Sequence, residues 1–152
     1  RVDSAPGRGA EFAVYLPHAP ASAPADAPAD RGARGAEVVL AADADGPARA
    51  VTALALRARG YTVLEADSAD RAVAAAREHP GPVDLAVYDL GLGGAGGLLS
   101  DLRAARPGLR ALVVSGFLPP DAAPPGAAFL AKPFAPRALA VKVRQVLDGV
   151  PG

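Results

Sequence analysis

The chain has 152 residues, and its 16 basic and 16 acidic side chains give a formal net charge of zero. This length allows one well-cored domain with an appendage but not two full domains. The balanced charge, without a basic run, excludes an electrostatic surface for nucleic acid or anionic lipid. With no cysteine and only His18 and His79 as histidines, the sequence excludes disulfides, thiolate catalysis, cysteine-ligated zinc and a histidine-rich metal site.

The segment Glu11–Leu16 is the first predicted strand. Phe12, Val14 and Leu16 alternate there with other side chains in the period of two that is typical of a β-strand, and a glycine-rich turn precedes them within residues 1–17. Because an isolated hairpin is only marginally stable in water, we expect this strand to come from a sheet whose remainder is missing from the sequence.

Residues 18–35 predict a flexible, solvated linker. Pro20, Pro24 and Pro28 are spaced among Ala, Asp, Ser and Gly, and almost no side chain of this stretch is suited to burial. The sequence starts at Arg1 without a signal-peptide pattern, and we expect it to be a piece of a longer chain. No apolar run approaches the roughly 20 residues that a membrane helix needs.

Predicted strands and helices alternate over residues 36–149, which we assign to one domain. The strands are expected at 38–42, 61–64, 83–88, 109–114 and 127–130, and the helices at 47–59, 68–78, 98–105 and 136–147. Short apolar strands that alternate with helices favour a parallel sheet covered on both faces, and right-handed crossovers then make the α/β fold doubly wound. In such folds ligands bind outside the carboxyl ends of the strands.

The helix boundaries are predicted from caps and breakers. Asp67 or Ser68 is expected to cap the second helix, and Gly60 to end the first. For the first helix we predict one apolar face of Val51, Leu54, Ala55 and Ala58. For the last helix we predict an inward face of Leu139, Val143, Val146 and Leu147.

Polar side chains follow four of the predicted strands. Asp43 and Asp45 come after the first strand, Asp89 after the third, Ser115 after the fourth and Lys132 after the fifth. Because clustered carboxylates repel one another, they are best tolerated with a lysine or a divalent cation between them, and Mg2+ prefers oxygen ligands. An aspartate in this setting can act as a nucleophile towards phosphorus.

The same residues resemble the receiver domains of two-component response regulators. The resemblance runs from Glu37 to Leu147 and is carried by the segments Asp43–Asp45, Gly60–Ala66, Val83–Asp89, Val113–Phe117 and Phe129–Phe134. It implies a flavodoxin-like five-stranded parallel sheet. It also implies a bacterial phosphorelay module that accepts a phosphoryl group from phosphohistidine and switches a protein-interaction surface.

By this resemblance Asp89 is the phosphoacceptor, and Mg2+ is held by Asp43, Asp89 and the backbone carbonyl of Gly91. The sequence departs from the family at Ala44, which replaces the second member of the acidic pair. We expect the loss of this oxygen ligand to weaken Mg2+ binding unless Asp45 or a shift in register compensates.

Three further residues gain roles from the resemblance. Ser115 is implied as the switch hydroxyl, Lys132 as a contact to the phosphoryl group and Phe129 as the aromatic side chain that changes rotamer. The peptide bond before Pro133 is implied to be cis.

Residues 1–17 are similar to the closing hairpin of a histidine-kinase ATP-binding domain. The two resemblances together imply the carboxyl-terminal part of a hybrid histidine kinase. They imply that this segment is cytoplasmic, in a parent kinase that can be anchored to the membrane by a segment further upstream. The implied partners are a phosphohistidine-bearing kinase or phosphotransfer domain and a downstream regulator. We expect this chain alone to lack the ATP site and the phosphodonor histidine.

Two other functions remain open from the sequence. Ala44 and the glycine-rich loop after Asp89 are also consistent with a degenerate receiver that acts only as an interaction module. Gly91, Gly93 and Gly96 form a literal G-x-G-x-x-G, the pattern of a nucleotide-binding or flavin-binding domain. That pattern normally follows the first strand and has an acidic residue about 20 positions on, whereas here it follows the third strand.

Overall fold

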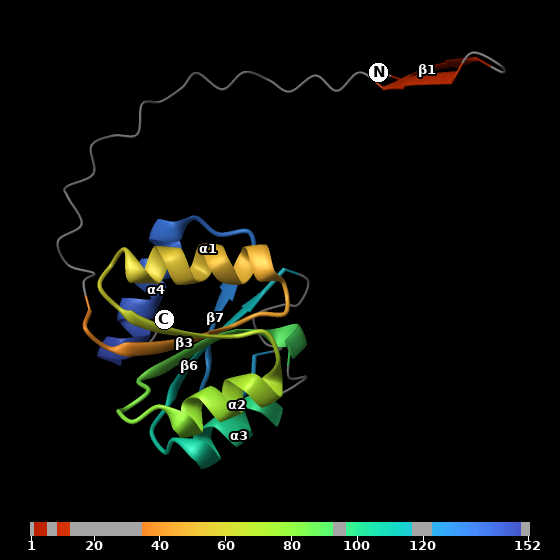
Figure 1. The fold of residues 1–152 in the computed structure, drawn as a ribbon. Coiled ribbons are helices and arrows are strands. Elements are labelled where there is room, and N and C mark those ends of the chain that lie inside the picture. The colour runs from red at the N-terminus through yellow and green to blue at the C-terminus, as the bar shows by residue number, and fades with distance from the viewer. Residues whose placement is uncertain (1, 6–8, 13–34, 93–96, 117–122, 150–152) are drawn as a thin grey trace, which may run out of the picture. The chain divides into compact units, whose positions relative to one another are not determined.

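The structure is a computed structural model that describes residues 2–5, 9–12, 35–92, 97–116 and 123–149 (Figure 1). The chain divides into two compact units, Arg1–Asp30 and Arg31–Gly152. In the first unit, β1 (Val2–Ala5) pairs with β2 (Gly9–Phe12) as an antiparallel hairpin. β2 therefore begins before the predicted strand. Residues 13–34, with the end of that strand and most of the predicted linker, lie outside the described residues.

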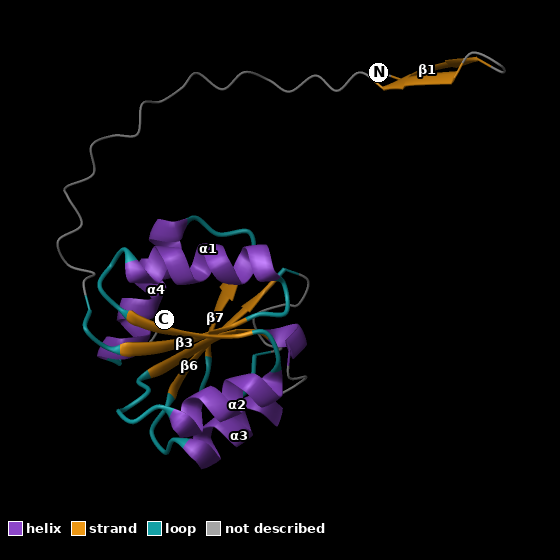
Figure 2. Cartoon of the chain, in the orientation of Figure 1, coloured by secondary structure: helices purple, strands orange, loops and turns teal. Residues whose placement is uncertain are grey.

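The second unit is a five-stranded, all-parallel sheet with helices on both faces (Figure 2). Its elements are β3 (Val38–Ala42), α1 (Gly46–Arg57), β4 (Thr62–Ala66), α2 (Ala69–Glu78), β5 (Leu85–Asp89), the 3-10 turn η1 (Leu90–Leu92), α3 (Gly97–Ala105), β6 (Arg110–Ser115), β7 (Ala128–Ala131) and α4 (Pro136–Asp148). The strand order β4-β3-β5-β6-β7 reverses beside β3. The predicted doubly wound fold is confirmed.

Each strand of the sheet contributes to two hydrophobic cores. Leu40, Tyr88 and Val113 pack towards α2 and α3, while their neighbours Val39 and Leu112 belong to the core under α1 and α4. Figure 1 shows the two helix pairs on opposite sides of the sheet. Burial on both faces explains why the strands are nearly continuous apolar runs.

The helix ends follow local chemistry. The side chain of Asp45 caps α1 and that of Ser68 caps α2, each by accepting a backbone N–H three residues on. Gly60 has a φ of 94° in the turn after α1, a conformation that glycine adopts without strain. Among the described helices, none is long and apolar enough to cross a bilayer.

The predicted apolar face of α1 is wrong for Val51, Leu54 and Ala58, which are exposed, whereas Ala55 is partly buried against the core. Val51 is 58% exposed and Leu54 is 69% exposed, whereas Ala53 and Leu56 are the buried residues. Alanine-rich helices offer more than one stripe with helical spacing, so the pattern did not determine which stripe faces the sheet. The small side chain of Ala53 occupies the contact face instead. In α4, by contrast, Leu139, Val143 and Leu147 are buried as predicted, and Val146 is partly buried.

Candidate functional site

The carboxyl ends of four strands bring charged and polar side chains into one pocket. Asp43 follows β3, Asp89 ends β5, Ser115 ends β6 and Lys132 follows β7. The pocket has a volume of about 700 Å³ and is lined by Asp43, Ala44, Asp45, Ala48, Asp89, Gly91, Ser115, Gly116, Lys132 and Pro133. Parallel pairing of neighbouring strands places these ends at one edge of the sheet, which is where such folds bind ligands.

Lys132 bridges the two carboxylates of the pocket. Its Nζ lies 2.7 Å from Asp43 Oδ2 and 2.8 Å from Asp89 Oδ1. Burial by itself would lower the pKa of Lys132, but the hydrogen bonds and charges of Asp43 and Asp89 outweigh it and the pKa is raised. The ammonium group therefore stays protonated and compensates the repulsion between the two carboxylates.

The second oxygen of Asp89 is held by the following turn. The backbone N–H of Gly91 donates to Asp89 Oδ2 at 2.9 Å. A Cβ at position 91 would lie only 2.9 Å from the same oxygen, so a glycine permits this close approach. Gly93 and Gly96, the other glycines of the G-x-G-x-x-G pattern, lie outside the described residues.

Every polar group of Asp43 is engaged. Its N–H donates to the carbonyl of Ala66 at 3.1 Å, and its Oδ1 accepts the N–H of Asp45 at 2.9 Å. Its carbonyl accepts Nη1 of Arg49 at 2.6 Å. Arg49 was not predicted as a site residue from the sequence. The one feature that pointed to it is its position, six residues after Asp43 in the helix that follows the acidic loop.

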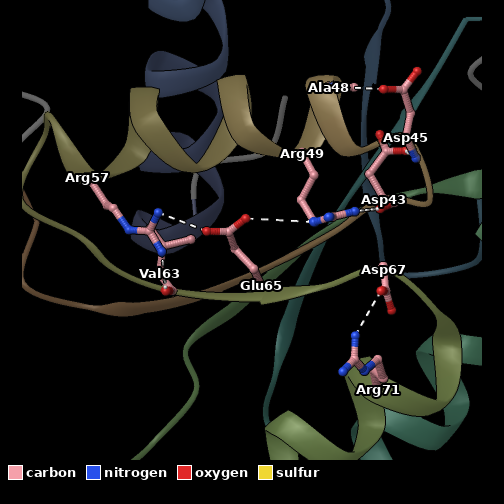
Figure 3. Close-up of polar contacts among 9 residues, drawn as sticks. All are labelled: Asp43, Asp45, Ala48, Arg49, Arg57, Val63, Glu65, Asp67 and Arg71. Carbon is pink, nitrogen blue, oxygen red and sulfur yellow. Dashed lines mark hydrogen bonds and ion pairs between the residues drawn. The ribbon is translucent and has the colours of Figure 1, made fainter.

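Asp45 is occupied as a helix cap (Figure 3). Its Oδ1 accepts the N–H of Ala48 at 3.0 Å, and Ala44 has no side-chain ligand to offer. Over the described residues, no group of three or more His, Cys, Asp or Glu side chains is arranged to hold a metal ion. Asp43 and Asp89 nevertheless converge on one cation, the ammonium of Lys132. This donor pair fits a hard divalent cation that keeps several of its waters.

Of the remaining predicted residues, Ser115 and Pro133 line the pocket and Phe129 does not. Ser115 is buried, with 6% of its surface exposed, and its carbonyl accepts the N–H of Lys132 at 2.8 Å. Phe129 is partly buried against the core under α2 and α3, paired in register with Val113. The peptide bond between Lys132 and Pro133 is cis.

Comparisons with known proteins match this architecture. No protein-family profile matches the chain. The curated sensor kinase CckA of Brucella abortus (strain 2308) is 32% identical over 166 aligned residues, which cover 96% of this chain and 17% of that protein. The crystal structure of the receiver domain of the hybrid histidine kinase CckA is 33% identical with a TM-score of 0.63, covering 72% of this chain and 98% of the receiver domain.

A response regulator of Burkholderia pseudomallei, solved with a phosphorylated aspartic acid, a calcium ion and citrate, is 26% identical with a TM-score of 0.58. The match covers 71% of each chain. The present chain spans about a sixth of the Brucella kinase, so its similarity to that protein concerns one part of it. With the parallel sheet and the pocket at its carboxyl edge, these matches show that the chain is homologous to CckA hybrid kinases and belongs to the receiver-domain family of two-component signalling proteins.

Proposed function

We propose that this receiver accepts a phosphoryl group on Asp89 from the phosphohistidine of a kinase or phosphotransfer domain. The observation that carries the proposal is the ammonium of Lys132 between the carboxylates of Asp43 and Asp89, in the pocket that these residues line. A carboxylate that is 27% exposed in its side chain, with a fixed cation beside it, is accessible to an incoming phosphoryl group.

The proposed step is a displacement at phosphorus. A carboxylate oxygen of Asp89 attacks the phosphorus atom, the P–O bond forms, the P–N bond to the imidazole breaks, and the leaving imidazole takes up a proton from solvent. In this proposal Lys132 neutralises charge on the phosphoryl oxygens, and the hydroxyl of Ser115, which lines the same pocket, donates a hydrogen bond to one of them. Gly91 N–H keeps the second oxygen of Asp89 oriented during the transfer.

A bound Mg2+ would supply further neutralisation of charge on the phosphoryl oxygens. Asp43, Asp89 and the backbone carbonyl of Gly91 would hold it, with lowered affinity because Ala44 contributes no oxygen. The response regulator of Burkholderia pseudomallei, which carries a phosphorylated aspartic acid and a calcium ion, supports this pairing of cation and phosphoacceptor.

We further propose that phosphorylation acts through Ser115 and Phe129. The two residues sit on neighbouring strands, β6 and β7, and movement of either would alter the surface formed by β6 and α4. A downstream regulator would recognise that surface.

The same proposal covers the rest of the chain. We assign residues 1–17 to the closing hairpin of a histidine-kinase ATP-binding domain, residues 18–35 to a linker and residues 36–149 to the receiver, in a cytoplasmic part of a hybrid kinase. The alignment to the Brucella kinase supports this, because it covers 96% of the chain and so extends beyond the receiver.

A second candidate is a receiver that acts only as an interaction module. Ala44 and the use of Asp45 as a helix cap favour it, because they leave two carboxylates for a cation. Titration with Mg2+ by calorimetry separates the two: binding that is weakened by Asp43→Ala counts against the interaction module, and the absence of binding favours it.

The proposal is tested by labelling the full chain with a radiolabelled small phosphodonor, such as acetyl phosphate, in the presence of Mg2+. We expect the label in the parent chain and in the control Asp101→Ala, whose exposed aspartate lies on α3, but not in Asp89→Ala. A label that survives Asp89→Ala contradicts the assignment.

A further inference from the structure

Arg49 of α1 lies between the acidic loop and the neighbouring strand β4 (Figure 3). Its Nη1 donates to the backbone carbonyl of Asp43 at 2.6 Å, and its Nε lies 3.7 Å from Glu65 Oε2. The side chain is 21% exposed, so both interactions are partly shielded from water. Charge-assisted hydrogen bonds of this kind are stronger than neutral ones.

The contact reaches Asp43 through its backbone. The Asp43 N–H is fixed by the carbonyl of Ala66, and its Oδ1 by the N–H of Asp45. The carbonyl is the remaining backbone group, and Arg49 holds it. Together these contacts fix the peptide planes on both sides of the Cα atom from which the carboxylate projects towards Lys132.

Because position 44 is an alanine, cation binding by the acidic loop depends more strongly on the orientation of the Asp43 carboxylate. With alanine at position 44 and Asp45 engaged as a cap, Asp43 is the member of the acidic loop whose carboxylate contacts Lys132. We propose that Arg49 is a positioning residue, which holds the Asp43 carboxylate in the orientation needed for cation binding and for phosphoryl transfer. This inference rests on the proposed function of Asp89.

Glu65 orients Arg49 from the other side. It lies on β4 and accepts contacts from two arginines of α1: Arg49, and Arg57 through Nη1 at 2.9 Å. Arg57 also donates to a backbone carbonyl, that of Val63, at 3.1 Å. The two arginines therefore share their helix, their carboxylate partner and the type of backbone contact, but only the carbonyl bound by Arg49 belongs to a site residue (Figure 3).

Arg57 accordingly supplies a matched control. We compare Arg49→Gln with Arg57→Gln in the full chain, first by the NMR chemical shift and hydrogen exchange of the Asp45 amide without any phosphodonor. This amide donates to Asp43 Oδ1 and reports the carboxylate position directly. We expect a shifted and faster-exchanging amide in Arg49→Gln and an unchanged one in Arg57→Gln.

The second readout is Mg2+ affinity by calorimetry, followed by the labelling rate with acetyl phosphate. We expect Arg49→Gln to lower both by about tenfold, the size typical of a residue that orients a metal ligand, and Arg57→Gln to leave both within about twofold. A lysine at position 49 lacks the planar guanidinium and can reach only one of the two partners of Arg49. We therefore expect the Mg2+ affinity and labelling rate of Arg49→Lys to lie between those of the parent and Arg49→Gln.

An unchanged Asp45 amide in Arg49→Gln overturns the inference, as does an equal loss of Mg2+ affinity in Arg57→Gln. Failure of the proposed function would look different. The parent chain would then take no label, while the Asp45 amide would still shift in Arg49→Gln and the positioning role would stand.

Discussion

At each end of the strands of the parallel sheet, the amino edge and the carboxyl edge, one cation lies between two carboxylates. The surroundings of the two cations differ. At the carboxyl edge, Lys132 bridges Asp43 and Asp89, and all three residues line the pocket. At the amino edge, Arg144 bridges Glu37 at 2.7 Å and Asp148 at 2.8 Å. A cation bridged between two carboxylates is therefore not by itself evidence of a reactive site.

The difference lies in the cation and its surroundings. The planar guanidinium of Arg144 uses Nε, Nη1 and Nη2 on its two partners, and the nearby Tyr61 is only 3% exposed. Gly35 packs so closely that a Cβ there would come within 2.1 Å of Glu37 Oε2. The ammonium of Lys132 is instead a compact point charge, able to exchange one oxygen partner for another. The ion pairs at the amino edge therefore stabilise the packing there, whereas those at the carboxyl edge line a pocket that a ligand can enter.

The largest expected effect comes from Lys132→Met. Removal of the bridging charge should slow phosphorylation of Asp89 by about a hundredfold, the loss typical of one electrostatic stabiliser of a transition state. Labelling rates with acetyl phosphate measure it. Lys142→Met, a lysine on α4 outside the site, is the control; equal rates in the two variants would contradict the role of Lys132.

Gly35→Ala should act on stability alone. The new Cβ would lie 2.2 Å from Tyr61 Cε1, so the folded chain would have to shift to accommodate it. We expect this strain to lower the free energy of unfolding by about 2 kcal/mol without changing the labelling rate. Denaturant unfolding measures it. Gly97→Ala, where a Cβ meets nothing within 4 Å, is the control. A Gly35→Ala chain as stable as the parent would contradict the close packing at this edge.

Ala44→Asp should strengthen cation binding at the carboxyl edge and leave the amino edge unchanged. A third carboxylate in the acidic loop would offer the pocket another oxygen ligand, and we expect Mg2+ affinity to rise by about tenfold. Calorimetry checks this. Ala104→Asp, the same change at an exposed position of α3 outside the pocket, should not raise it. An Ala44→Asp chain that binds Mg2+ no better than the parent would show that position 44 does not face the cation.

The smallest expected effect is the pH response of the amino edge. Burial tends to raise the pKa of Glu37, but its hydrogen bond and attraction to Arg144 outweigh this and the pKa is lowered below the ordinary value of 4.5. The folded state then binds fewer protons than the unfolded one. The stabilisation from Glu37 is therefore complete above pH 4.5 and is lost as the pH falls through the folded value.

Glu37→Gln should remove this dependence, which we expect to be about 0.5–1 kcal/mol because the pair is partly exposed. Unfolding measured in denaturant between about pH 6 and 3 tests it. Parallel curves for the parent and Glu37→Gln would mean that Glu37 does not titrate with folding.

Much of this architecture was predictable from sequence. Parallel strands place their carboxyl ends together, so Asp43, Asp89, Ser115 and Lys132 could be grouped from local patterns alone. The inward face of α4 was also predictable, because Leu139, Val143 and Leu147 recur every four residues along the helix. The face of α1 was not, since alanines fill more than one of its stripes.

Long-range contacts away from the carboxyl ends of the strands could not be predicted, because no rule of the fold groups their residues. Arg144 meets Glu37 over 107 residues, and no local pattern specifies that pair. Asp45 shows a different limit: an aspartate before a helix can be a cap or a ligand, and the choice depends on where its carboxylate points in three dimensions.

The chemistry of the phosphorylated residue tests most directly whether Asp89 is the phosphoacceptor. An aspartyl phosphate is reduced by borohydride to homoserine, which mass spectrometry locates in the sequence. After transfer from a phosphorylated histidine-containing protein, we predict homoserine at position 89. Modification at Ser115 or at a histidine instead, with Asp89 intact, would contradict the account.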